Sequence, residues 1–158
     1  MKAVIGIGTN IGDRLENLKY SISALDLIPE TKVEKISNVY ETEPWGYENQ
    51  DKFLNCAVIV ETQLSPNAIL GVCLGIEAGM GRKRKFKNGP RIIDLDLLLY
   101  ENAKANTNEL KLPHPGVFNR AFVLAPLADL FTDKTVFGYN FKNEYSKCNF
   151  DGVSIYTS

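Results

Sequence analysis

Strand-like and helix-like patterns alternate along this chain in a fixed order, and that order limits the folds it can adopt. Mostly apolar residues over 2–8 and 53–62 are typical of buried strands, and β-branched residues in near-alternation over 32–42 predict another strand. A helix is expected from its cap at Asp13 to Pro29, and a second from the cap at Ser65 to Gly79 or Gly81. A last apolar strand lies within residues 89–100.

The resulting order is β-α-β-β-α-β, which predicts an α+β chain with a ferredoxin-like core. A further short helix is expected over residues 122–130. Residues from about 132 onward are polar and aromatic without a clear period, so we expect an added C-terminal segment that is helical or irregular. No repeat or linker is visible, and residues 1–158 are interpreted as a single domain.

Composition places the chain among ordinary soluble proteins. It has 158 residues and a net charge of -1, and no apolar run approaches the roughly 20 residues of a membrane span. The N-terminal stretch does not resemble a secretion signal, and Cys56 and Cys73 lie in apolar stretches typical of small core residues. We therefore expect a cytoplasmic protein without a membrane partner.

The strand within 89–100 carries two carboxylates, Asp94 and Asp96, among apolar residues. Because side chains alternate along a strand, the two aspartates should share one face, while Leu95, Leu97 and Leu99 fill the other. Two adjacent anions repel each other and are costly to desolvate without a positive charge between them. Either this strand end is open to water, or a cation belongs there.

Basic residues crowd the sequence GRKRKFKNGPR, residues 81–91, directly before this pair. Alone, such a run most often marks a solvated face, and nucleic-acid binding is a further possibility. Beside paired carboxylates it suggests polyphosphate chemistry, because arginines bind phosphate oxygens and carboxylates hold Mg²⁺ against the same phosphates. The only histidine, His114, is held between two prolines. A structural role and a positioned functional role remain equally open for it.

Five stretches together resemble the 6-hydroxymethyl-7,8-dihydropterin pyrophosphokinase family. They are GTNIGDR, YETEPWG, DKFLNCAV, GRKRKFKNGPRIIDLDLLLY and LPHPGVFNRAFVLAPL, which span residues 3 to about 130 in the family's order. The resemblance implies the ferredoxin-like fold, ATP as co-substrate, and transfer of pyrophosphate to the hydroxymethyl group of the pterin in folate biosynthesis. It also implies two Mg²⁺ ions. Separately from the resemblance, we expect a monomer.

The resemblance also assigns roles to individual residues. Those expected to be catalytic are Arg82, Arg91, Asp94 and Asp96, the two aspartates being the metal ligands. Those expected to bind ATP are Glu77, Arg82, Arg84, Arg91, His114 and Arg120. Those expected to bind the pterin are Thr42, Trp45, Phe53, Asn55 and Phe122, with the two phenylalanines on either face of its ring. Leu74 and Asn88 depart from the family pattern, at a nucleotide position and beside the pterin.

Two alternatives from other classes stay open on the sequence. The first is a ferredoxin-like RNA-binding module that uses the basic loop over 82–91 and exposed aromatic residues. The slightly negative net charge and the lack of an RNP-type motif argue against it. The second is a regulator that binds the same metabolites without turnover.

Overall fold

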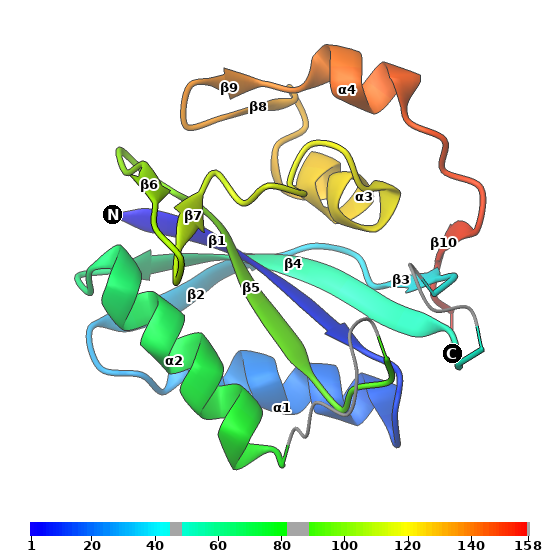
Figure 1. The fold of residues 1–158 in the computed structure, drawn as a ribbon, viewed down its shortest axis with the longest axis horizontal. Coiled ribbons are helices and arrows are strands. Elements are labelled where there is room, and N and C mark those ends of the chain that lie inside the picture. The colour runs from blue at the N-terminus through cyan, green and yellow to red at the C-terminus, as the bar shows by residue number, and fades with distance from the viewer. Residues whose placement is uncertain (45–48, 82–88, 158) are drawn as a thin grey trace.

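The computed structural model describes residues 1–44, 49–81 and 89–157. Its elements appear in chain order in Figure 1. The main strands and helices are β1 (Lys2–Thr9), α1 (Arg14–Asp26), β2 (Thr31–Ile36), β3 (Tyr40–Thr42), β4 (Phe53–Thr62), α2 (Pro66–Gly79), β5 (Asp94–Tyr100) and α3 (Ala121–Leu130). The smaller elements are β6 (Ala105–Asn106), β7 (Lys111–Leu112), β8 (Thr135–Val136), β9 (Tyr139–Asn140), α4 (Lys142–Lys147) and β10 (Val153–Ile155).

The main sheet has the order β10-β3-β4-β1-β5, and β2 also pairs with β4. All of these pairings are antiparallel. Because β1 and β2 both run antiparallel to β4, they are parallel to each other with β4 between them. The same holds for β4 and β5 around β1, so two split βαβ units interlock, as the predicted ferredoxin-like order requires.

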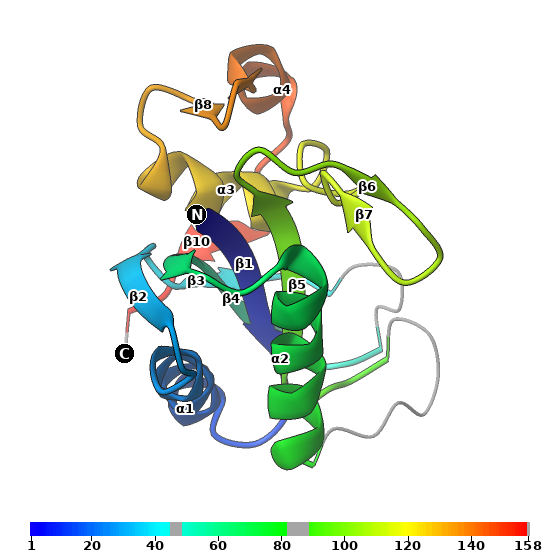
Figure 2. The ribbon, with the colours of Figure 1, turned by 90° about the vertical axis from the view of Figure 1, so that its left-hand side faces the viewer.

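The sheet is the middle of three layers. Helices α1 and α2 cover one face, and α3 with the C-terminal segment covers the other (Figure 2). Apolar residues of β1, β4 and β5 that point toward α1 and α2 form one core cluster, which includes Ile5, Leu54 and Leu97. Those that point toward α3 form a second cluster, which includes Val4, Ala57 and Leu98.

The two covering helices begin where the sequence places their caps. The Asp13 carboxylate accepts a hydrogen bond from the Glu16 backbone N–H at 3.2 Å, and the Ser65 hydroxyl does the same for Ala68 at 3.2 Å. Pro66 takes the first position of α2, where its missing N–H costs nothing. Such caps satisfy backbone donors that the first helical turn leaves without partners.

The expected strand over 32–42 is divided. Residues 37–39 separate β2 from β3, although both segments pair with β4. The Ser37 hydroxyl accepts from the Ala57 N–H at 2.9 Å, which satisfies a β4 donor at the break. The C-terminal segment is also more regular than expected, because β10 joins the main sheet beside β3. Its prediction as only helical or irregular was wrong for the three short strands β8, β9 and β10.

The alternation predicted for β5 holds only for its first half. Leu95 and Leu97 point toward α1 and α2, but Leu99 belongs to the cluster under α3, together with Leu98. The register shifts here, with Val4 opposite Leu99 and Ile5 opposite Leu97, so Leu98 is an extra residue on β5. A bulge of this kind reverses the faces of the residues that follow it, and the placement of Leu99 with Leu95 was therefore wrong.

Within the described ranges, no helix combines the length and the apolar character needed to cross a membrane.

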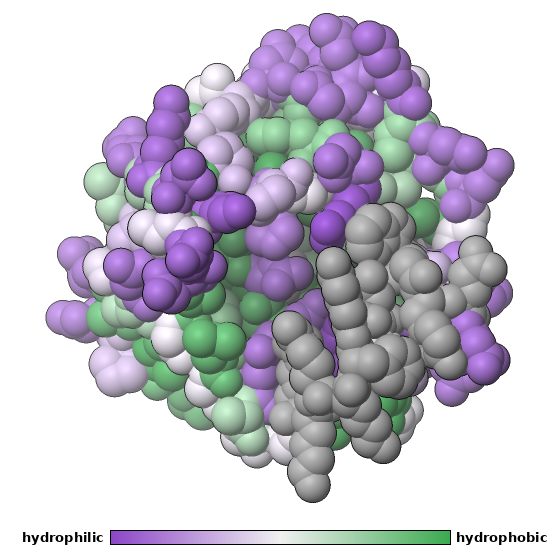
Figure 3. Space-filling view, viewed as in Figure 1, coloured by the Kyte–Doolittle hydropathy of each residue, from purple (hydrophilic) through white to green (hydrophobic). Residues whose placement is uncertain are grey.

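Hydrophilic side chains gather at the top of the molecule, over α4 (Figure 3). That the chain forms a single domain stays a prediction.

Two leucines at the end of α1 test the packing of this layer. Leu25 is 0% exposed and Leu27 is 82% exposed. Leu25→Ala should lower the free energy of unfolding by about 2–5 kcal/mol, because it leaves a cavity in the core. Leu27→Ala, the matched control, should change it by less than about 0.5 kcal/mol. Urea denaturation measures both, and equal effects would contradict this packing.

Candidate functional site

The candidate site lies on the face of the sheet that α3 covers only in part. At one end of this face, Val4, Ala57, Ile59 and Leu98 pack under α3 and its neighbours. Toward the other end the same alternation places Gly8 of β1, Phe53 and Asn55 of β4, and Asp94 and Asp96 of β5. The candidate site therefore lies on the same face of the sheet as the second core cluster, at the end that α3 does not cover.

Gly8 makes room at the centre of this surface. It pairs with Asn55 on β4 and with Asp94 on β5. A Cβ atom at Gly8 would lie 2.5 Å from Asn55 Oδ1, too close for any real contact. Glycine in a strand often marks a place where another group approaches the backbone closely. Here the missing Cβ atom leaves room for the Asn55 amide, which lies over β1 beside the pocket.

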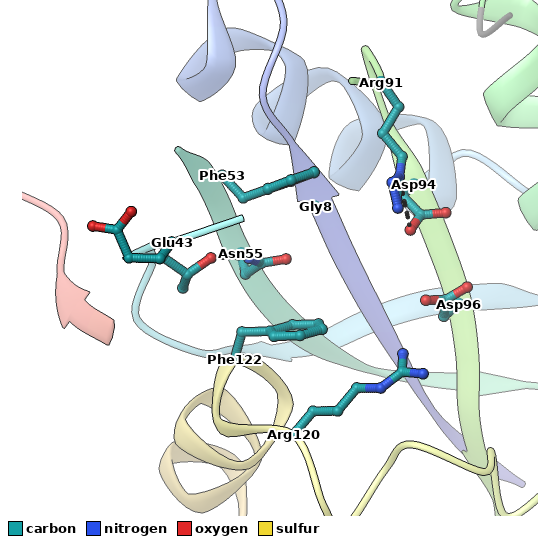
Figure 4. Close-up of a pocket in the computed structure, with 10 residues that line it drawn as sticks. Gly8, Glu43, Phe53, Asn55, Arg91, Asp94, Asp96, Arg120 and Phe122 are labelled. Carbon is teal, nitrogen blue, oxygen red and sulfur yellow. Dashed lines mark hydrogen bonds and ion pairs between the residues drawn. The ribbon is translucent and has the colours of Figure 1, made fainter. Parts of the chain in front are cut away.

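A pocket opens over Gly8, between the start of β4, the start of β5 and the start of α3 (Figure 4). Its lining residues are Gly8, Thr42, Glu43, Phe53, Asn55, Arg91, Asp94, Asp96, Arg120 and Phe122. Phe53 and Phe122 flank the pocket from opposite sides, and Asn55 lies between them. A flat ring can therefore enter between two aromatic side chains and meet an amide at its edge.

The polar edge of the pocket is fixed by one hydrogen-bonded pair, a half-buried Asn55 and a buried Thr42. Asn55 Nδ2 donates to Thr42 Oγ1 at 2.7 Å, and Thr42 is 2% exposed. The Thr42 hydroxyl can still donate its own hydrogen, and the Asn55 amide retains acceptor capacity. Together they offer donors and acceptors side by side, which suits a heterocycle with both kinds of group.

Asp94 and Asp96 line the other end of the pocket (Figure 4). Burial, together with the negative charges of Asp94 and Glu77, raises the pKa of Asp96 to about 7, against the opposing effect of Arg91 and Arg120. The nearby arginines therefore do not fully offset the negative charge of the Asp94–Asp96 pair. The described residues hold no cluster of three or more His, Cys, Asp or Glu side chains placed for a metal.

Arg91 is held in position by its backbone and its side chain. Its N–H donates to Asn10 Oδ1 at 2.9 Å, and its carbonyl accepts from the Asn10 N–H at 3.1 Å. Its Nε lies 3.4 Å from Asp94 Oδ2, and its guanidinium lies 5.3 Å from the centre of the Phe53 ring. The guanidinium thus lies between the aromatic part of the pocket and the carboxylates.

Arg120 approaches the pocket from the residue just before α3. Its guanidinium lies 6.0 Å from the centre of the Phe122 ring. A Cβ atom at Gly116 would lie 2.5 Å from Arg120 Nε, so this side chain packs directly over the glycine backbone. Two arginines therefore approach the aspartate pair from different segments.

A second pocket lies on the outer side of β5. Its lining residues are Leu70, Leu74, Glu77, Asp94, Leu95, Asp96, Leu97, Asn108, Glu109, Leu110, Lys111, His114 and Pro115. Glu77 Oε2 accepts from the Leu95 N–H at 2.7 Å and so satisfies a donor of this edge strand. Asp94 and Asp96 line both pockets and stand at the boundary between them.

His114 lines the second pocket, where its neutral imidazole ring can donate a hydrogen bond. Its backbone N–H donates to the Leu98 carbonyl at 2.9 Å, and its Nδ1 accepts from the Gly116 N–H at 3.1 Å. Burial, and then the charge of Arg120, lower the pKa of His114, while Asp94 opposes them. With Nδ1 accepting, the proton of the neutral ring resides on Nε2.

The structure thus brings together most residues expected at the site. Glu77 and His114 line the second pocket, and Thr42, Phe53, Asn55, Arg91, Arg120, Phe122 and the two aspartates line the first. Trp45, Arg82, Arg84 and Asn88 lie outside the described residues. Leu74, the other departure from the family pattern, is 55% exposed on α2.

Sequence reasoning did not single out Asn10 or Glu43. Asn10 is 3% exposed, and its Nδ2 donates to Gln50 Oε1 at 2.8 Å and to the Asp51 carbonyl at 3.0 Å. It therefore joins the end of β1 to two distant loops. In the sequence, Asn10 is one polar residue within the stretch GTNIGDR, and no local pattern marks it as buried.

Comparison with known proteins agrees with this geometry. The chain belongs to the 7,8-dihydro-6-hydroxymethylpterin-pyrophosphokinase (HPPK) family, whose profile matches residues 4–132. It is 42% identical to a 2-amino-4-hydroxy-6-hydroxymethyldihydropteridine pyrophosphokinase of Methylorubrum extorquens, over 96% of each chain. It is 44% identical to a protein of the same name from Bacillus subtilis, over 81% of this chain and 77% of the relative. The RNA-binding alternative finds no support in these matches.

Solved structures agree on the fold. A crystal structure of HPPK-DHPS from Plasmodium falciparum with SDX-DHP superposes with a TM-score of 0.69, at 17% identity. Another HPPK-DHPS, in complex with substrates, gives a TM-score of 0.67 at 16% identity. This chain spans 47% and 42% of those chains, respectively. The prediction of an α+β, ferredoxin-like fold is confirmed.

The raised pKa of Asp96 has a consequence for stability in metal-free buffer. Between the ordinary aspartate pKa of 3.8 and about 7, the folded state binds more protons at Asp96 than the unfolded state does. The free energy of unfolding should therefore fall as the pH rises through this window. Asp96→Asn should flatten that fall, whereas Asp151→Asn, an exposed control, should leave it unchanged. Urea denaturation from pH 4 to 8 with EDTA measures this, and identical slopes would contradict it.

Proposed function

We propose that this site transfers pyrophosphate from ATP to the hydroxymethyl group of 6-hydroxymethyl-7,8-dihydropterin, releasing AMP. The observation that carries the proposal is that Asp94 and Asp96 line two pockets at once, one with an aromatic and amide lining and one on the outer side of β5. A group-transfer enzyme needs its two substrates to meet at one charged boundary.

The first pocket is proposed for the pterin. Its ring would lie between Phe53 and Phe122, which flank the pocket (Figure 4), with its polar edge toward Asn55 and Thr42. Aromatic faces and a half-buried amide match a flat heterocycle that has both donors and acceptors. The hydroxymethyl group would then point toward the aspartates. Trp45 stays a predicted neighbour of the pterin, outside the described residues.

The second pocket is proposed for ATP. His114 can donate from Nε2 to a phosphate or ribose oxygen, and Glu77 lies beside the Asp94–Asp96 pair. Arg91 and Arg120, which line the first pocket with the two carboxylates, would contact the transferred phosphates. Arg82 and Arg84 are proposed to complete this set, although their positions lie outside the described residues.

Two Mg²⁺ ions are proposed to bind Asp94 and Asp96 together with the ATP phosphates. The fit rests on the carboxylates themselves, which share one strand face. Burial, and then the negative charge of Asp94, raise the pKa of Asp96. Mg²⁺ in phosphoryl-transfer sites is commonly held by one or two carboxylates plus substrate oxygens. Bound there, the metal would supply positive charge to the transferred phosphates and to the acceptor oxygen.

The chain's own residues would then work by positioning and electrostatics. The hydroxymethyl oxygen would attack the β-phosphorus of ATP, the bond from that phosphorus to the AMP oxygen would break, and the hydroxyl proton would leave toward the carboxylate pair. Arg91 and Arg120 would stabilise the charge that develops on the phosphate oxygens. No covalent enzyme intermediate is needed, because both substrates are held at the shared boundary.

The remaining expectations follow from this assignment. The chain is proposed to act as a monomer in the cytoplasm on these two small molecules, without a nucleic-acid or membrane partner. The decisive test incubates the protein with ATP, Mg²⁺ and 6-hydroxymethyl-7,8-dihydropterin and separates the nucleotides. AMP is the expected product. ADP would indicate an ordinary kinase, and pterin binding without either product would indicate a regulator.

Removing one carboxylate should separate catalysis from folding. Asp94→Ala, and separately Asp96→Ala, should lower kcat by about 10²–10³-fold or more, because each removes a group proposed to act at the reacting phosphates. The melting temperature without metal should stay level or rise, because the repulsion between the pair is relieved. AMP release and thermal denaturation measure the two effects. A variant that unfolds yet keeps normal activity per folded molecule would show that the pair is structural.

The aromatic pair should distinguish the two substrates. Phe122→Ala should weaken pterin binding by about two- to tenfold, the loss expected for one aromatic stacking contact, and leave ATP binding nearly unchanged. Phe131→Ala, at the other end of α3, is the matched control and should change neither. Titration calorimetry with each ligand measures this. Equal losses for pterin and ATP would contradict the placement of the pterin ring.

A further inference from the structure

We infer that the C-terminal strand β10 positions the pterin pocket by holding β3, and with it Thr42, in place. The inference rests on the proposed function of that pocket. It concerns a segment beyond the family profile, which matches residues 4–132, whereas β10 spans Val153–Ile155.

The strand that supplies Thr42 has little support of its own. β3 is only three residues long, and it pairs on one side with β4, where Thr42 lies opposite Phe53. Without a further strand it would be the edge of the sheet, and a short edge strand is held weakly in register. A shift of Thr42 would carry the hydroxyl away from Asn55 and from the polar edge of the pocket.

β10 supplies the missing neighbour. Val153 pairs with Thr42, and Ile155 pairs with Tyr40. The pairing extends beyond the strand at both ends, because the Glu43 N–H donates to the Gly152 carbonyl at 3.0 Å and the Tyr156 N–H donates to the Val39 carbonyl at 2.8 Å. The backbone of β3 is thereby held along its whole length between β4 and β10.

The contact at Gly152 is close and specific. Gly152 has φ +79°, in the left-handed region that favours glycine, and a Cβ atom there would lie 2.7 Å from Glu43 Cγ and 3.3 Å from Glu43 Cβ. Glu43 is next to Thr42 in sequence and lines the same pocket. Any side chain at residue 152 would therefore push directly on the segment that carries Thr42.

The other end of β10 is tied to the same region by Tyr156. Its ring lies 5.7 Å from the guanidinium of Arg14. Arg14 in turn donates to the Lys52 carbonyl at 3.0 Å, just before β4, and pairs with Glu41 of β3 at 2.9 Å. β10 is thus connected to β3 and, through Arg14, to the residue before β4, and β3 and β4 are two of the strands that line the pterin pocket.

The test compares Gly152→Ala with Gly138→Ala. Both glycines lie in the C-terminal segment at positive φ, +79° and +87°, so both substitutions strain the backbone similarly. Only Gly152 has close neighbours, because no atom lies within 4 Å of a Cβ built at Gly138. Gly152→Ala should raise KM for the pterin about fivefold, while kcat and KM for ATP stay within about twofold of the wild type.

Gly138→Ala should lower the melting temperature without changing any of the three kinetic parameters. A merely structural role for β10 predicts the same result for Gly152→Ala, a lower melting temperature with an unchanged KM for the pterin, and that outcome would overturn the inference. If Gly152→Ala does not fold, Tyr156→Ala decides by the same parameters. It loosens β10 from the other end without placing an atom against Glu43.

The wild-type reaction separates this inference from the proposed function. If the wild type forms AMP and Gly152→Ala or its substitute keeps the wild-type KM for the pterin, only the role of β10 fails. If the wild type binds the pterin without turnover, the dissociation constant from titration calorimetry replaces KM in the same comparison. If the wild type does not bind the pterin at all, the proposed function fails and the inference fails with it.

Discussion

The site depends on the pairing of β1 with β4 on one side and β5 on the other. This register places Gly8 opposite both Asn55 and Asp94. It therefore brings the polar edge of the first pocket close to the two carboxylates, which line both pockets. The glycine is required because the Asn55 amide occupies the space that a Cβ atom would fill. The same register packs Val4, Ala57 and Leu98 under α3, so core and site are two ends of one sheet face.

Electrostatic imbalance at the strand end is the second organising feature. Desolvation of the half-buried Asp96 raises its pKa most, the negative charges of Asp94 and Glu77 raise it further, and Arg91 and Arg120 oppose them. A protein built for stability alone would seldom keep such a group, since replacing it would relieve both repulsion and desolvation. The arrangement suits the proposed binding of Mg²⁺ and ATP, because the positive charge of the metal would offset the negative charge of the carboxylates.

Sequence reasoning was most reliable where periodicity and caps agreed. Asp13 and Ser65 cap α1 and α2 as expected, and α3 forms over Ala121–Leu130 although it contains Pro126, because burial of its apolar face outweighs the backbone bond that proline cannot make. It failed at the bulge near Leu98, at the break before Tyr40 and at the pairing of β10. Each of these depends on a partner strand far away in sequence, which local pattern does not contain.

The sequence by itself determined the order of elements, the resemblance to one enzyme family and the pairing of Asp94 with Asp96 on one strand, because these follow from residues that are neighbours in the chain. Only the tertiary structure decided that Asn10 joins β1 to Arg91 and to the loop before β4, and that the two aspartates line two pockets. It alone placed β10 beside the strand of Thr42, with Gly152 packed close to Glu43. Contacts between residues separated by tens of positions arise from sheet register and layer packing, and no short stretch of sequence encodes them.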